Sequence, residues 1–182
     1  VKRFGMRNAL QPNHLTVKLT GSAGQSLGAF AAPGLKIEVS GDANDYVGKG
    51  LSGGTIVVRP PMRSPLVAAE NTIIGNTVLY GATDGYLFAA GRAGERFAVR
   101  NSGAKVVVEG CGSNGCEYMT GGVAVILGSI GANFGAGMTG GMAYIYDPEG
   151  VTGTMINMET LVTCPVTVAH WEDQLKGLLE RH

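Results

Sequence analysis

Glycine pairs that recur at a nearly fixed interval constrain the fold of this chain more than any other feature. Gly-Gly or small-Gly pairs precede six apolar, strand-like runs, and the second residues of these pairs are positions 34, 54, 85, 103, 122 and 141. The intervals between them are 20, 31, 18, 19 and 19 residues, and the long one contains the proline-rich segment 59–65. A repeat of about 19 residues is typical of a solenoid, in which each repeat stacks on its neighbour.

Each repeat has the composition of one coil of a parallel β-helix. Short β-rich runs alternate with glycine, which adopts the positive φ of a tight corner without steric cost. We therefore expect an all-β fold, a parallel β-helix in which each coil adds short strands to stacked sheets. The side chains expected to point inward and form the core are Ile56, Val58, Val106, Val108, Val123, Val125 and Ile145.

Polar residues form a second pattern, eight or nine positions before the glycine pairs. Asp45, Asn76, Asn114 and Asn133 occupy these positions. In successive coils they would lie ~4.8 Å apart, the spacing of neighbouring strands. We expect side chains at these positions to form hydrogen bonds along the column.

The glycine rhythm stops near Val151. This predicts a β-helix domain over residues 1–150 and a C-terminal tail over residues 151–182. Within the tail, residues 170–181 have the pattern of an amphipathic helix, with apolar residues at 171, 175, 178 and 179 on one face. Two placements of this helix stay open, a cap on the last coil or a contact with another domain.

Composition excludes several classes of protein. The 14 basic residues equal the 14 acidic ones, so the basic excess of a phosphate-bound nucleic-acid binder is missing. No apolar run approaches the ~20 residues of a membrane-spanning helix. The start resembles neither a signal peptide nor a complete N-terminus, which suggests a piece of a longer chain. Three cysteines, an odd number, together with no secretory feature favour a cytoplasmic location.

The motifs that could carry chemistry have simpler structural interpretations. Three G-x-G-x-x-G matches start at Gly48, Gly110 and Gly135, and we expect corners there because β-type runs, not helices, follow them. Cys111 and Cys116 are expected to be structural thiols. The oxygen-rich segment 42–45, with Asp42 and Asp45, could hold a calcium ion or bond to backbone amides. No grouping of acids, bases or nucleophiles is apparent, so we predict no catalytic, cofactor-binding or metal-binding residues.

The densest polar stretch is a candidate interdomain contact. Arginine suits bidentate contacts with carboxylates across an interface. Solvation of an ordinary surface is the alternative. The candidate residues are Arg92, Glu95, Arg96, Arg100 and Asn101.

Several long glycine-rich blocks resemble one family. Residues 41–54, 91–97, 115–122 and 133–141 are similar to the C-terminal GXGXG domain of the large (alpha) subunit of glutamate synthase. The resemblance implies a right-handed β-helix. It also implies a parent enzyme that converts glutamine and 2-oxoglutarate to two glutamates, with an amidotransferase domain that releases ammonia and a separate domain that holds FMN and a 3Fe-4S cluster. No cysteine motif of those domains is matched, so Cys111, Cys116 and Cys164 inherit no role.

The expected function is therefore a non-catalytic scaffold with no cofactor of its own. Its expected partners are the amidotransferase and FMN-binding domains of the same subunit, and the small subunit. A stand-alone β-helix binding module and a solenoid carbohydrate-active enzyme are the alternatives. The electron donor of the parent enzyme (NADPH, NADH or ferredoxin) and the oligomeric state are not predicted. At the recurring corner Gly122, a valine is expected to destabilise the fold by ~1–3 kcal/mol.

Overall fold

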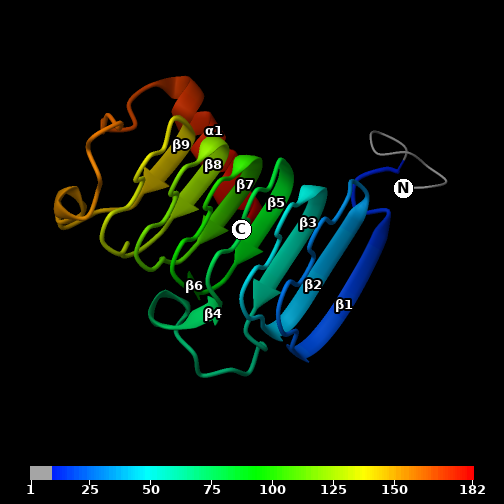
Figure 1. Ribbon diagram of the computed structural model, residues 1–182. Helices are drawn as coiled ribbons and strands as arrows, with labels where there is room; N and C mark the ends of the chain where they lie inside the picture. The colour runs from blue at the N-terminus through cyan, green and yellow to red at the C-terminus, as the bar shows by residue number, and fades with distance from the viewer. Residues whose placement is uncertain (1–9) are drawn as a thin grey trace.

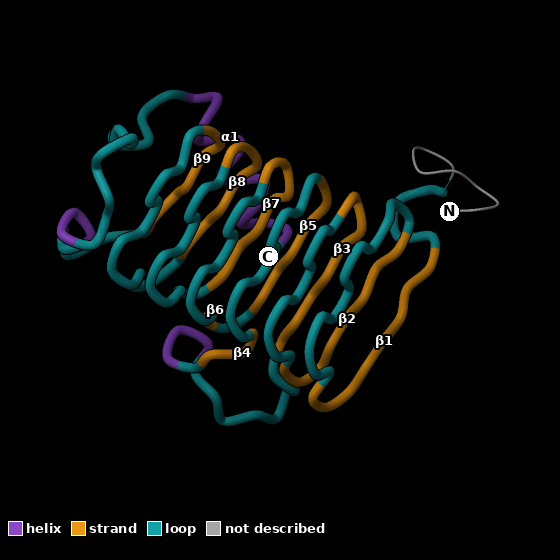
Figure 2. The backbone as a smooth tube through the Cα atoms, viewed as in Figure 1, coloured by secondary structure: helices purple, strands orange, loops and turns teal. Residues whose placement is uncertain are grey.

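Successive coils of the chain stack so that seven parallel strands form one long sheet (Figures 1 and 2). The computed structural model describes residues 10–182. The order of strands in the sheet is β1-β2-β3-β5-β7-β8-β9, and β4 pairs with β6 at a corner. The elements are β1 (Leu15–Ser22), β2 (Leu35–Asp42), β3 (Ser52–Arg59), a 3-10 turn (Ala68–Glu70), β4 (Thr72–Ile74), β5 (Asp84–Ala89), β6 (Arg92–Ala93), β7 (Ser102–Val108), β8 (Thr120–Ile126), β9 (Gly140–Ile145), a 3-10 turn (Thr152–Thr154) and α1 (Ala169–Arg181).

The register of the sheet follows the predicted repeat. Lys36 pairs with Thr55 and Tyr86 with Lys105, each one coil apart. In the long interval Thr55 pairs with Tyr86, so the extra residues leave the stack as a loop. The predicted parallel β-helix is confirmed. Strand β1 was not among the predicted runs, and it adds a coil before the first of them.

On the side away from the large sheet, the coils are built from consecutive turns (Figure 2). In each of six coils, three alternate residues have positive φ, as Arg96, Ala98 and Arg100 do with values of 56, 57 and 54°. The N–H groups of these three residues donate alternately to the next coil, the previous coil and the next, each at 2.9 Å. The triads are Ser26, Gly28 and Phe30; Tyr46, Gly48 and Gly50; Thr77, Leu79 and Gly81; Arg96, Ala98 and Arg100; Asn114, Cys116 and Tyr118; and Asn133, Gly135 and Gly137.

Residues other than glycine also supply the corners of this ladder. Phe30, Leu79 and Cys116 take the same left-handed conformation, with φ of 58, 59 and 57°. Such a conformation costs a non-glycine residue roughly 1–2 kcal/mol. It persists because hydrogen bonds to neighbouring coils and packing of the core over-determine the backbone.

The solenoid interior contains most of the predicted core. Ile56, Val58, Val106 and Val108 are fully buried there, and the half-buried Ile145 packs against them. Val123 and Val125 are also buried, but they lie on the opposite face of the sheet, in a second cluster. Their neighbours Ala124 and Ile126 point inward instead. The prediction was wrong at these two valines because β8 is apolar on both faces and its register shifts between residues 120 and 123.

Helix α1 covers the outer face of the sheet where that face is apolar. Leu178 belongs there to one buried cluster with Phe88, Val107 and the two valines of β8, and Tyr144 donates a hydrogen bond to Gln174 Oε1 at 2.9 Å. The guanidinium of Arg181 lies 3.7 Å from the centroid of the Tyr86 ring. The helix is therefore neither a cap on the last coil nor free to dock elsewhere through Leu178. No helix in residues 10–182 has the length and apolar character needed to cross a membrane.

The segment before the helix covers the C-terminal end of the solenoid. Ile156 forms a parallel bridge with Phe134, and Ile156 and Leu161 pack against the interior core. This segment begins with a tight loop in which the Asp147 carboxylate accepts hydrogen bonds from the N–H groups of Val151 and Thr152, both at 3.0 Å. The loop therefore anchors the cap to the end of β9.

Replacement of Asp147 by asparagine is expected to lower Tm at neutral pH. Hydrogen bonds from Thr152, and then from Val151, hold the pKa of the Asp147 carboxyl below its ordinary value of 3.8. The ionised carboxylate therefore stabilises the folded chain above that value, and the contribution is lost as pH falls through the folded-state pKa. We expect the Tm difference between the two proteins to shrink as pH is lowered from about 7 towards 2. A difference that stays constant over this range would contradict the assignment.

Candidate interdomain surface

The predicted polar column forms, in two parts that bond differently. Asn133 Nδ2 donates to Asn114 Oδ1 at 2.8 Å, and Asn157 Nδ2 donates to Asn133 Oδ1 at 3.0 Å. In the other part, Asp45 Oδ1 accepts from the Asn76 N–H at 2.8 Å, and Asn76 Oδ1 accepts from the next coil in the same way. The column thus ties coils together, and Asn157 extends it into the tail, where the glycine rhythm gives no signal.

Aromatic and charged side chains gather on the outer surface of the turns, which we call the turn face. Phe30 is 68%, Tyr46 38% and Tyr118 51% exposed. Aromatic residues and arginine are the residues most enriched at the energetic centres of protein interfaces. The turn face consists of Phe30, Tyr46, Lys49, Arg96, Arg100, Glu117 and Tyr118.

The turn face is held in place by contacts between coils. Arg96 Nε donates to Glu117 Oε2 at 3.0 Å, one coil further along. The Arg100 guanidinium carbon lies 5.9 Å from the centroid of the Tyr118 ring. That ring in turn lies over Gly137, where a Cβ would come within 2.5 Å of it. Because a side chain at position 137 would displace the ring, glycine there keeps the surface preorganised.

The structure separates the predicted polar stretch into different environments. Arg96 and Arg100 lie together on the turn face, with the exposed Glu95 beside them. Arg92 is half-buried in β6, at the corner formed with β4. Asn101 is fully buried. It therefore presents no surface to another domain.

Asn101 closes a bend of its own backbone. Its Nδ2 donates to the carbonyl of Ala104 at 2.9 Å, and its Oδ1 accepts from the N–H groups of Ala104 at 3.0 Å and Gly103 at 3.3 Å. Sequence reasoning missed the aromatic residues of the turn face. Tyr118 could have been found, because it stands one repeat after Arg100, at the same position in the coil.

A model of the family described as "GXGXG motif" matches residues 1–182. This chain belongs to the GXGXG family. Among its curated relatives, the glutamate synthase (NADPH) large chain of Azospirillum brasilense is 69% identical over 181 residues. The glutamate synthase (NADH) of Schizosaccharomyces pombe is 55% identical, and ferredoxin-dependent glutamate synthase 2 of Synechocystis is 51% identical, again over 181 residues. Each match covers 100% of this chain but only 12%, 8% and 12% of those relatives.

Two of the three thiols of this GXGXG chain lie in the interior core. All three cysteines are free, and Cys111 and Cys116 are buried in the interior core. Burial raises the pKa of Cys111 to about 12 and raises that of Cys116 well above its ordinary value. Iron–sulfur clusters are held by thiolates, typically several together. Within residues 10–182, no group of three or more His, Cys, Asp or Glu side chains converges on one point.

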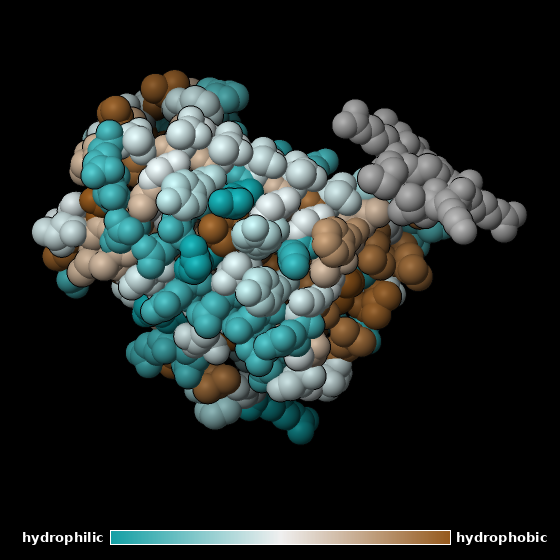
Figure 3. Space-filling model, viewed as in Figure 1, coloured by the Kyte–Doolittle hydropathy of each residue, from teal (hydrophilic) through white to brown (hydrophobic). Residues whose placement is uncertain are grey.

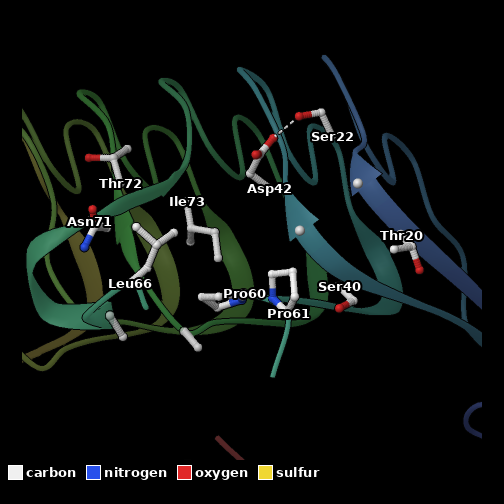
Figure 4. A pocket seen from close by; sticks show the side chains of 14 residues that line it. Thr20, Ser22, Ser40, Asp42, Pro60, Pro61, Leu66, Asn71, Thr72 and Ile73 are labelled. Atoms are coloured by element: carbon white, nitrogen blue, oxygen red, sulfur yellow. Dashed lines mark hydrogen bonds between the residues drawn. The ribbon is translucent and has the colours of Figure 1, made fainter. Parts of the chain in front are cut away.

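The oxygen-rich segment of the GXGXG chain has its carboxylates engaged by neighbouring coils. Asp42 Oδ1 accepts from Ser22 Oγ at 2.6 Å, while Asp45 supports the polar column. The Asp42–Ser22 pair lines a pocket of about 340 Å³ beneath the proline-rich loop (Figure 4). A second hollow, of about 390 Å³, lies at the last coil. No arginine, lysine or histidine lines either hollow, so neither offers a cation to the phosphate of a nucleotide.

The three glycine-rich matches are corners, as predicted. The one at residues 48–53 runs into β3, and the one at residues 135–140 runs into β9. The third, at residues 110–115, leads into the turns that precede β8. A dinucleotide fingerprint opens a helix at its last glycine, and each of these opens a turn or a strand instead.

Proposed function

We propose that this chain is a non-catalytic structural domain of a glutamate synthase large subunit, where it holds the catalytic domains in a fixed relation. The observation that carries the proposal is the breadth of its relatives. Chains named for NADPH, NADH and ferredoxin are 69%, 55% and 51% identical to this one over 181 residues. A segment shared by enzymes with three electron donors does not select the donor, and a common mechanical role accounts for the similarity.

The β-helix is suited to that role because its coils are joined on two sides. The seven-stranded sheet joins them on one side, and the ladder of turns joins them on the other. Close-packed interiors have low compressibility and transmit force rather than absorb it. Errors of about 1 Å in the placement of reacting groups can lower a rate about 100-fold, so a stiff spacer between catalytic domains serves the reaction.

The chemistry of the parent enzyme lies outside this chain in our proposal. That enzyme would form two glutamates from glutamine and 2-oxoglutarate, with FMN and a 3Fe-4S cluster in another domain. The buried neutral thiols and the cation-free hollows described above do not fit either group. We assign residues 1–150 to the β-helix domain and residues 151–182 to its tail, and we place the protein in the cytoplasm. Because the chain spans only 8–12% of its relatives, a domain is favoured over a stand-alone binding module.

The proposed contact surface is the turn face, which would meet the amidotransferase or FMN-binding domain, or the small subunit. Charge reversal at Arg100 in the full-length parent enzyme is the test. We expect Arg100→Glu to leave glutamine hydrolysis intact and to lower the glutamate formed per glutamine consumed from about two towards one, with the missing nitrogen released as ammonia, by loosening the relation between catalytic domains. The measurement is parallel assay of glutamine, ammonia and glutamate in one reaction.

The matched control for this variant is Arg63→Glu, which makes the same charge change in the exposed proline-rich loop. We expect the control to keep the wild-type ratio. An Arg100→Glu enzyme with an unchanged ratio would remove the turn face from the proposal. If the isolated chain hydrolysed glutamine or bound FMN, the scaffold proposal itself would be rejected.

A further inference from the structure

The N-terminal end of the solenoid exposes apolar side chains at strand positions that core residues occupy in the next coil. All eight residues of β1 are exposed, including Leu15 at 57%, Val17 at 36% and Leu19 at 39%. Val17 and Leu19 pair with Ile37 and Val39 of β2, which are buried in the interior. Figure 3 shows a hydrophobic patch over this end of the molecule. The inward face of the first coil therefore remains open to solvent.

The two ends of the solenoid differ in this respect. The C-terminal end is covered by the chain's own tail, through Ile156 and Leu161. Within residues 10–182, no strand pairs with β1 on the side away from β2. Uncovered edge strands of this length are templates for pairing with another polypeptide.

The hydrogen-bonding groups of the first coil match what an added strand would need. Leu15 N–H donates to the Gly34 carbonyl, and Ala23 N–H to that of Asp42, both at 2.9 Å. Because N–H groups alternate in direction along a strand, those of the even-numbered residues between them point away from β2. These outward amides belong to Thr16, Lys18, Thr20 and Ser22.

The turns of the first coil also contain a backbone N–H that lacks a backbone acceptor within residues 10–182. In each later coil, the middle residue of the triad donates its N–H to the coil before, as Gly48 does to Leu27 at 2.9 Å and Leu79 to Val47 at 2.8 Å. The equivalent residue in the first coil is Gly28, and its N–H has no backbone acceptor within residues 10–182. Both the strand and the turn of this coil thus present groups for a further layer.

We propose that an extended segment of the same parent polypeptide, from outside residues 10–182, adds to β1 as an eighth strand and covers this end. The inference rests on the proposed function, since it requires the chain to be one part of a longer polypeptide. Its relatives supply such a length, because this chain is 12% of the Azospirillum protein. Leu10 lies against Gly34 at the same end, so the polypeptide reaches the first coil where the patch lies. A tethered segment also binds at high effective concentration, which a separate partner does not.

Hydrogen exchange of backbone amides in the full-length parent enzyme tests this proposal. We expect the outward amides of Thr16, Lys18 and Thr20 to exchange at least about 100-fold more slowly than solvent-exposed amides. The Leu19 amide, which faces β2, is the internal reference and is expected to be protected as well. Outward amides that exchange at the unprotected rate would overturn the inference, and so would an unprotected Leu19 amide, because β1 would then not be a strand.

A pair of variants in the full-length enzyme adds a matched comparison. Lys18→Pro removes one outward N–H and places a ring on the edge, which an edge strand tolerates but an added strand does not. Lys18→Ala keeps the N–H. We expect protection of Thr16 and Thr20 to be lost in the proline variant and kept in the alanine variant. Equal protection in both would overturn the inference.

Two further outcomes separate this inference from its alternatives. If the protection of the outward amides disappears when the enzyme is diluted until it is monomeric, a second copy of the enzyme covers the edge. The inference would then fail. If the edge is unprotected while Arg100→Glu still lowers the ratio of glutamate to glutamine, the inference fails and the scaffold function stands. Protection with an unchanged ratio in Arg100→Glu supports the strand and removes only the turn face.

Discussion

Valine at position 122 is expected to destabilise the chain by about 3 kcal/mol or more, beyond the effect of its backbone conformation alone. Gly122 has a φ of +84°. A Cβ at this position would meet the carbonyl oxygen of Ala104 and lie 2.8 Å from Asn101 Nδ2. The neighbours on the previous coil are a backbone carbonyl and a fully buried side chain, and neither can move aside without a large cost in free energy. Denaturant unfolding followed by circular dichroism measures the loss.

The matched control is Gly150→Val. Gly150 also has positive φ, at +69°, but a Cβ there would have nothing within 4 Å. We expect this variant to lose only roughly 1–2 kcal/mol, the effect of the left-handed backbone on a side chain. Equal losses at the two positions would show that close approach between coils contributes nothing at Gly122.

Alanine at position 101 is expected to have a similarly large effect, about 3–5 kcal/mol. The Asn101 side chain satisfies the carbonyl and N–H of Ala104 and the N–H of Gly103, and it is fully buried. Its removal takes a hydrogen-bond partner from each of these backbone groups, and the two groups of Ala104 are buried, where losing a partner costs about 1–3 kcal/mol each. The free energy of unfolding, from denaturant titration, is the measurement.

Asn71→Ala provides the comparison for Asn101. Asn71 makes one exposed hydrogen bond, from Nδ2 to the Val67 carbonyl at 2.8 Å, and water can replace it. We expect a loss within about 0.5–1 kcal/mol. If the two alanine variants were equally stable, the bend closed by Asn101 would not need its side chain.

Several features of the fold could be predicted because they repeat. Coils that pair strand to strand must have nearly equal lengths, so the interval between glycine pairs revealed both the solenoid and the proline-rich insertion. The same repetition located Gly122 as a corner and placed Asn114 above Asn133. Each of these predictions depends on the similarity of one coil to the next, and that similarity is visible within a single sequence.

Only some residues of the turn face could be predicted from the sequence. Arg96 and Arg100 were found from local charge density, whereas Phe30 and Tyr118 were missed because isolated exposed aromatics carry no local signal. Asn101 was grouped with the arginines for the same reason, since adjacency in sequence cannot show that a side chain turns inward. Such assignments depend on which residues of neighbouring coils lie within reach.

The sequence by itself determined the stacking of the coils, because hydrogen bonding between successive coils imposes a common length and glycine marks where one backbone approaches another. Only the tertiary structure decided which way the two-faced strand β8 points Val123 and Val125, and that α1 lies on the outer sheet rather than over the last coil. A strand with apolar residues at both odd and even positions can bury either face. An amphipathic helix can likewise pack on any apolar surface. The choice is made by contacts between segments far apart in the chain.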